Sequence, residues 1–140
     1  MIEITLVPPE YVPHYWDAAY PILEKAFKHA RFPVREEDVL TECLSGAQTL
    51  WLIYEGNPLN IVAAVTVRVK QYPQAKVVCS EHLGGERADE WIDLLEETIS
   101  SYGKAIGATS IEVIGRQGWW RHLKDRGWNT GMVIYHKEIE

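Results

Sequence analysis

The segment from Gly115 to Trp128, GRQGWWRHLKDRGW, gathers the side chains that are best suited to binding another molecule. Tryptophan and arginine are the residue types enriched at binding hot spots, so an exposed indole ring with arginines around it would form an anchor. The residues that could form this anchor are Trp119, Trp120, Arg116 and Arg121. The interpretation that we favour is structural: at least two of the three rings pack onto a sheet, each burying roughly 150 to 250 Å², and the exposed anchor is the alternative for one ring.

Other site chemistries have weaker support in this sequence. The histidines show no metal-ligand spacing and the two cysteines add none, so we expect no metal site. There is no Gly-x-Ser-x-Gly motif and no Walker-type phosphate loop. Cys43 and Cys79 lie in apolar runs, where a free cysteine packs as a small hydrophobic residue, and a disulfide is the alternative.

Composition and charge narrow the class of protein. The chain has 140 residues and a net charge of −6, which argues against nucleic acid as a partner, because phosphate binding needs clustered lysine and arginine. No apolar run approaches the roughly 20 residues of a membrane span, and the N-terminus lacks the pattern of a signal peptide. We therefore expect one globular domain over residues 1–140, located in a cytosol and not in a membrane.

The pattern of apolar residues and turn signals predicts an alternation of strands and helices. Pro21 predicts a kink or break in the first helix, and Gly107 marks the end of the long amphipathic one. The expected strands are 3–7, 49–54, 61–69, 76–83, 110–114 and 132–139, and the expected helices are 15–27, 35–45, 88–106 and 119–124.

This order of elements resembles the GNAT superfamily of N-acetyltransferases over nearly the whole chain. The closing segment is also similar, since ATSIEVIGR, a short helix and DRGW match the family's strand, helix and glycine-aromatic turn. The resemblance implies an α/β (α+β) fold with a mixed, mostly antiparallel sheet of six or seven strands and about four helices. GGERADEWIDLLE and IEVIGRQGWWRHL also look like short GNAT-like proteins of tailed bacteriophages and prophages.

In that family acyl-CoA occupies an opening between the fourth and fifth strands, with its pyrophosphate on N–H groups at the start of the long helix. The resemblance places this cofactor-binding stretch at Gly84, Gly85, Glu86, Arg87 and Ala88. The sequence departs from the family motif, because Asp89 and Trp91 stand at the two glycine-like positions. Carboxylates there repel phosphate, and they also stabilise a helix N-terminus with no ligand present. Acetyl-CoA is therefore the expected cofactor only if the glycine pair rebuilds the site.

The family also implies a catalytic base at the end of the fourth strand, where Glu81 and His82 lie. On a regular strand these two side chains alternate, so only one could face the opening. The family's acid is a tyrosine four residues before the glycine of the turn, and Leu123 holds that position here. His122 is the neighbouring candidate for the acid, although one helical step turns a side chain by about 100°. Trp119 stands where the family has a small residue beside pantetheine, so its ring would fill the groove.

Two functions remain in competition at this stage. The favoured one is a phage-type GNAT-fold protein with a degenerate acyl-CoA site, which acts through a protein partner in a virion or against a host factor in the bacterial cytosol. The alternative is an acetyl-CoA-dependent N-acetyltransferase acting on a small amine or a protein amino group. A homodimer formed through exposed aromatic rings or through the last strand is left open.

Overall fold

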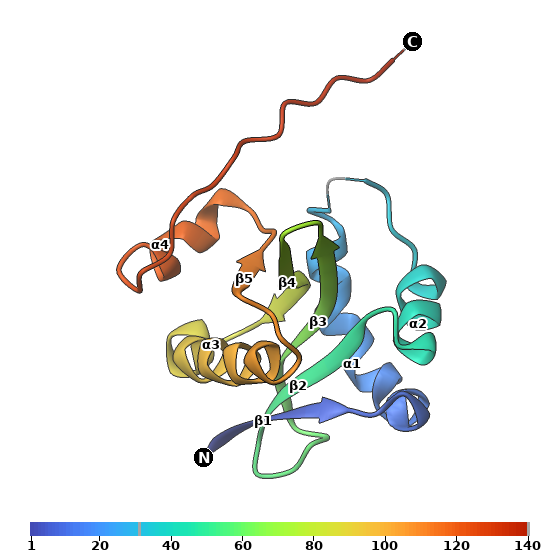
Figure 1. Cartoon of the computed structure of the whole chain (residues 1–140). Helices are drawn as coiled ribbons and strands as arrows, with labels where there is room; N and C mark the ends of the chain where they lie inside the picture. The colour runs from blue at the N-terminus through green and yellow to red at the C-terminus, as the bar shows by residue number, and fades with distance from the viewer. Residues whose placement is uncertain (31, 140) are drawn as a thin grey trace.

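The computed structural model describes residues 1–30 and 32–139. Along the chain its elements are β1 (Ile2–Val7), η1 (Pro9–Tyr11), α1 (Val12–Phe27), α2 (Glu36–Ser45), β2 (Thr49–Glu55), β3 (Ile61–Tyr72), β4 (Ala75–Gly85), α3 (Ala88–Ala105), β5 (Ser110–Val113), η2 (Gln117–Trp119) and α4 (Trp120–Leu123) (Figure 1). Helix α1 continues through Pro21, so the expected break is absent. No helix in these residues is long and apolar enough to cross a membrane.

The strands form one mixed sheet in the order β1-β2-β3-β4-β5. The first four strands pair antiparallel with their neighbours in sequence. Short turns connect β2 to β3 and β3 to β4, whereas α1 and α2 lie between β1 and β2. Strand β5 pairs with β4 in parallel, and α3 makes the crossover that a parallel pair requires. The described residues therefore hold a mostly antiparallel sheet of five strands.

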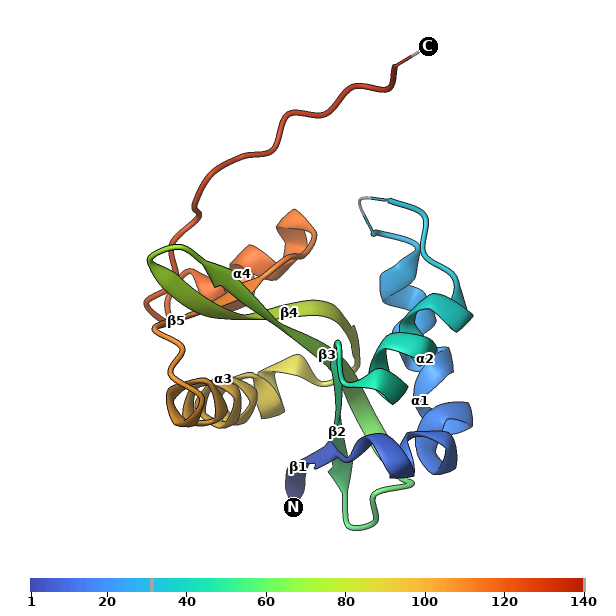
Figure 2. The ribbon, with the colours of Figure 1, turned by 45° about the vertical axis from the view of Figure 1, so that its right-hand side comes forward.

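Each face of the sheet is covered by a separate layer of helices, as Figures 1 and 2 show. Helices α1 and α2 cover one face and pack around Trp16, Leu23, Val39 and Leu52. Helix α3 covers the other face, where its apolar stripe meets a second core cluster that includes Trp91. Strands β1, β2 and β3 contribute side chains to both clusters, because successive side chains of a strand point to opposite faces of the sheet.

The expected last strand, 132–139, is not part of the sheet in the described residues. After the turn that follows α4, the chain runs away from the rest of the molecule as an extended tail (Figures 1 and 2). The expectation of six or seven strands is therefore wrong for this structure. The β-branched and aromatic residues of the tail favour a strand, but a strand also needs a neighbour to accept its hydrogen bonds.

Candidate functional site

An opening in the sheet is the first feature of the candidate site. The paired stretch of β4 and β5 ends where Ser80 lies opposite Val113, and the N–H of Ile114 donates to the carbonyl of Ser80 at 3.2 Å. Strand β4 continues from Glu81 to Gly85 beside β3 alone, while the chain turns away after β5. On its β5 side this end of β4 is thus a free strand edge that an extended ligand could line.

A β-bulge lies on β4 at this point of separation. Thr66 of β3 is opposite His82, whereas its neighbour Val67 is opposite Ser80, so Glu81 is the extra residue of the bulge. Both Glu81 and His82 contact residues of the face covered by α1 and α2, namely Arg68 and Phe27. The expectation that these two side chains alternate across the strand is therefore wrong, because the bulge interrupts the regular alternation.

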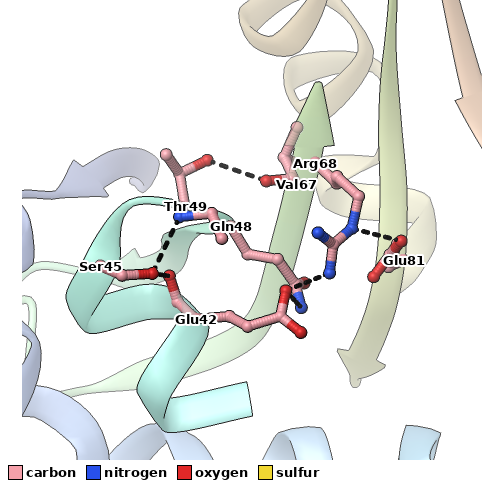
Figure 3. A network of polar contacts seen from close by, with 8 residues as sticks. Glu42, Ser45, Gln48, Thr49, Val67, Arg68 and Glu81 are labelled. Carbon is pink, nitrogen blue, oxygen red and sulfur yellow. Dashed lines mark hydrogen bonds and ion pairs between the residues drawn. The ribbon is translucent and has the colours of Figure 1, made fainter. Parts of the chain in front are cut away.

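Glu81 belongs to an ionic network that ties β3, β4 and α2 together (Figure 3). The Arg68 guanidinium donates to Glu81 Oε1 at 2.8 Å and also donates to the Glu42 carboxylate. Gln48 Nε2 donates to the same Glu42 carboxylate at 3.3 Å. Arg68 thus neutralises two carboxylates that would otherwise repel each other, and it fixes the direction of the Glu81 side chain.

His82 lies in the core beside this network. Only 8% of its surface is exposed, and its ring packs edge-on against Phe27 with 4.9 Å between ring centroids. Burial lowers the pKa of His82, and the nearby Arg68 acts in the same direction, while Glu81 opposes them. The imidazole is therefore held in its neutral form, which can accept a proton.

The glycine pair at the end of β4 is required by packing within the chain. A Cβ on Gly84 would lie 2.4 Å from the backbone oxygen of Ile22 in α1. Gly85 has a φ of +143°, and a Cβ there would lie 2.4 Å from the Cβ of Ala63. Within the chain, the close approach that these glycines permit is thus to α1 and β3, and their contact with a cofactor stays a prediction.

The start of α3 combines backbone strain with unsatisfied donors. Arg87, the residue before the helix, has a left-handed φ of +61°, which is unfavourable for a residue with a Cβ. Its guanidinium donates to Glu55 of β2 at 3.0 Å and to Glu90 at 2.6 Å, and these ion pairs hold the strained backbone in place. In the described residues no side chain caps the helix, and the Glu90 N–H already donates to the Arg87 carbonyl at 2.9 Å, so Ala88 and Asp89 have the N–H groups that an acceptor from outside could bind.

The acidic residues Asp89, Glu90 and Asp93 of α3 each have a side-chain partner, which is an arginine for two of them and a histidine for Asp89. Glu90 pairs with Arg87, and this hydrogen bond lowers the pKa of Glu90. Asp89 Oδ1 lies 3.1 Å from Nδ1 of His122, and Asp93 accepts from Arg126 at 2.7 Å. Arg87 and Arg126 therefore supply counter-charges to α3, and His122 supplies a hydrogen bond, which together reduce the repulsion that the sequence predicted for an anion at this helix.

His122 is held on the opposite face of the sheet from Glu81 and His82. Its Nε2 accepts from Nε of Arg121 at 3.4 Å, so Nδ1 carries the proton and donates to Asp89. The carboxylate thus selects the tautomer and leaves Nε2 as the acceptor nitrogen. The three residues expected to do acid–base chemistry are therefore divided into a pair on the α1 face and one residue on the α3 face.

The adjacent tryptophans have different surroundings. Trp119 packs against Trp91 with 6.1 Å between ring centroids, and with Leu123 and Trp128 it lines a small apolar cavity between β4, β5 and α3. The cavity measures about 20 Å³, roughly one water molecule. Trp120 is 37% exposed. Of the two rings expected to bind a partner, Trp119 therefore contributes to packing, and Trp120 faces solvent.

Sequence reasoning missed Glu42, Glu55 and Arg68 as members of this site. Arg68 offered a signal, because it is a charged residue that directly follows the mostly apolar, buried run of β3. Such a position implies partners on the facing helix layer. Within the described residues, no three histidine, cysteine or carboxylate side chains come together in a group that could hold a metal ion.

Solved structures of other proteins share this architecture over almost the whole chain. They include an acetyltransferase of Trypanosoma brucei, with a TM-score of 0.72 and 7% identity over 99% of this chain and 100% of that one. A predicted acetyltransferase of Clostridium acetobutylicum, solved with acetyl-CoA, has a TM-score of 0.72 and 8% identity over 99% and 96%. A ribosomal-protein-alanine N-acetyltransferase of Brucella melitensis has a TM-score of 0.72 and 10% identity over 99% of both chains.

These likenesses establish the class of fold: an α+β fold that this chain shares with solved acetyltransferases. In particular, the chain has the GNAT fold, as its resemblance in sequence predicted. No family model matches the sequence, and no curated protein matches it either. Since the identities are low, they establish the fold alone, and the resemblance to bacteriophage proteins stays a prediction.

Proposed function

We propose that this protein is an acetyl-CoA-dependent N-acetyltransferase acting on a small amine or a protein amino group. The observation that carries the proposal is the separation of β4 and β5 at a bulge occupied by Glu81. It leaves a free strand edge beside two proton acceptors, Glu81 and His82. The likeness to solved acetyltransferases over the whole chain supports the same function.

The residues present fit acyl-CoA through their backbone groups. The edge of β4 from Glu81 to Gly85 offers N–H and C=O groups to the amides of the pantetheine arm, in the manner of an added strand. The uncapped start of α3, at Ala88 and Asp89, offers N–H groups and a positive dipole end to the diphosphate. When bound, acetyl-CoA would supply the activated thioester.

The chain's own side chains would handle the protons. Glu81 is the candidate base for the ammonium of the acceptor, and Arg68 would hold its carboxylate in position. His82, neutral and adjacent in sequence, would be the alternative base. His122 would need to change tautomer or bind a proton before it could donate one from Nε2, because that nitrogen now accepts from Arg121.

The first test is calorimetric titration with acetyl-CoA and CoA, checked by thermal shift, where ligand at 100 times its Kd adds about 2.7 kcal/mol of stability. Trp119→Ala should tighten binding, because it removes the ring that lies between β4, β5 and α3. Trp120→Ala is the matched control, since that ring is partly exposed and outside the cavity lining. If neither the native protein nor Trp119→Ala binds millimolar acetyl-CoA, the proposed function is wrong.

A second candidate function is binding of a protein partner through the exposed Trp120 with Arg116 and Arg121. It is favoured by the exposure of Trp120 and by the position of Trp119 beside the opening, where its ring occupies space near the cofactor edge. The degenerate cofactor site, the phage origin and the virion or host-directed role of the sequence analysis belong to this candidate. A pull-down lost with Trp120→Ala and retained with Trp119→Phe would favour it.

A further inference from the structure

The indole N–H of Trp128 is a buried donor that lacks an acceptor. Gly127, with a left-handed φ of +81°, turns the chain after α4, and Trp128 packs against the core cluster around α3. In the part of the chain that the structure describes, Nε1 of Trp128 is buried and has no hydrogen-bond partner. Nε1 of Trp16, Trp51 and Trp91, by contrast, each donates to an acceptor, at 3.4, 2.9 and 2.6 Å. A buried donor without a partner destabilises the fold, so a ligand oxygen that reached it would be bound favourably.

Trp128 lines the small apolar cavity at the place where β4 and β5 separate. Ser80 and Val113, the last opposed residues of the two strands, belong to its lining, and so does Leu83 on the part of β4 that continues past the β5 pairing. Apart from Ser80 and Glu96, the lining consists of aliphatic and indole side chains. The unpaired N–H of Trp128 therefore belongs to a cavity that borders the free strand edge of the proposed cofactor site.

The size and polarity of this cavity favour a small acyl group. Its volume of about 20 Å³ is roughly that of one water molecule, so it suits a group as small as a methyl. A buried water makes about three hydrogen bonds, and this lining offers few polar atoms for them. An acetyl group fits better, because its methyl suits apolar walls and its carbonyl oxygen can accept a hydrogen bond from an indole N–H.

We infer that the indole N–H of Trp128 binds the carbonyl oxygen of the acyl group, and that the cavity receives the acetyl methyl. The inference rests on the proposed function and adds to it a residue that distinguishes acetyl-CoA from CoA. CoA ends in a thiol and has no thioester carbonyl, so only the acylated form can pair with this donor. Trp128 is thus a specificity-determining residue for the acyl donor, and the size of the cavity limits the length of the acyl chain.

Calorimetric titration of the native chain and of Trp128→Phe, each with acetyl-CoA and with CoA, tests this hydrogen bond. Phenylalanine removes the N–H and keeps an aromatic ring. We expect the affinity for acetyl-CoA to fall about threefold to tenfold, the range for one hydrogen bond, while the affinity for CoA stays within about twofold. A second variant carries at position 128 a tryptophan analogue with sulfur in place of the indole N–H, and it should behave in the same way without a change of ring size. Trp120→Phe is the matched control and should change neither affinity, since that ring is 37% exposed and outside the cavity lining.

The two ligands distinguish failure of this inference from failure of the proposed function. A native chain that binds both ligands with equal affinity, or a Trp128→Phe variant that loses the same factor for both, overturns the inference and leaves the proposed function standing. If the native chain binds neither ligand, the comparison is made in the Trp119→Ala background, where the neighbouring ring of the lining is absent. Absence of binding there as well refutes the proposed function and, with it, this inference.

The length of the acyl chain gives an independent test of the cavity. Butyryl-CoA carries two more methylene groups than acetyl-CoA, and the native chain should bind it at least about tenfold more weakly, because overpacking a small cavity is unfavourable. Val113→Ala shortens a lining side chain and should reduce this difference. Ile114→Ala is the control and should leave the difference unchanged, because that residue is 53% exposed and outside the lining. Equal affinity of the native chain for the two thioesters, or a difference that Val113→Ala leaves unchanged, would show that the acyl group lies outside the cavity.

Discussion

Arg68 on β3 donates from Nε to Oε1 of Glu81 at 2.8 Å, and so holds the extra residue of the β4 bulge against α2. The same guanidinium binds Glu42. All three side chains are largely shielded, with exposed side-chain fractions of 31% for Arg68, 35% for Glu42 and 21% for Glu81. The position of the candidate base is therefore determined by a charge on the neighbouring strand.

Replacing Arg68 by methionine should destabilise the fold. The change leaves Glu42 and Glu81 close together with no cation between them, and we expect a loss on the order of 1 to 2 kcal/mol in chemical denaturation. Arg35→Met is the matched control, because its ion pair with Glu37 spans 4.0 Å and its side chain is 81% exposed, so the change should stay within about 0.5 kcal/mol. The Arg68→Met change is also made in a Glu81→Gln background. If it costs the same unfolding free energy there as in the native protein, the ion pair with Glu81 is not the cause of the loss.

The sequence predicted most elements because their causes are local. The apolar stripe of α3 and the β-branched runs of β2 and β3 each follow from residue spacing. The sequence did not predict the bulge at Glu81, because one extra residue is defined only by the register against β3. It did not predict the role of Arg68 for a similar reason, since the partners of Arg68 lie 13 and 26 residues away in the chain. The tail has strand-like residues, but whether it pairs depends on which edge is within reach.

The stability of the protein should depend on pH through His82. Burial lowers the pKa of this imidazole in the folded state, so on acidification below its ordinary value of 6.5 the unfolded chain binds a proton that the folded chain does not. Stability should therefore fall as the pH drops from about 6.5 toward the folded-state pKa. His82→Gln should flatten the pH dependence of the unfolding free energy in this window. His14→Gln, at an exposed position, should not; equal slopes in all three proteins would contradict the assignment.

Gly84 should not tolerate a methyl group. An added Cβ would lie 2.4 Å from the backbone oxygen of Ile22, and neither α1 nor β4 can move without disturbing the core between them. We expect Gly84→Ala to cost about 1 to 3 kcal/mol of unfolding free energy. Gly118→Ala is the control, because a Cβ there meets nothing within 4 Å, and its effect should stay within about 0.5 kcal/mol. Equal stability of the two variants would mean that the approach of α1 to β4 is looser than the structure shows.

Two substitutions of Arg87 can distinguish the effect of backbone strain from the effect of ion pairing at the start of α3. Its φ of +61° suits glycine, while its guanidinium pairs with Glu55 and Glu90. Arg87→Ala and Arg87→Gly both remove the ion pairs, but only glycine relieves the left-handed backbone. The glycine variant should therefore be the more stable of the two by about 1 kcal/mol, as measured by urea unfolding. If alanine is as stable as glycine, the backbone leaves the left-handed conformation once the ion pairs are lost, which would show that these pairs impose the strain.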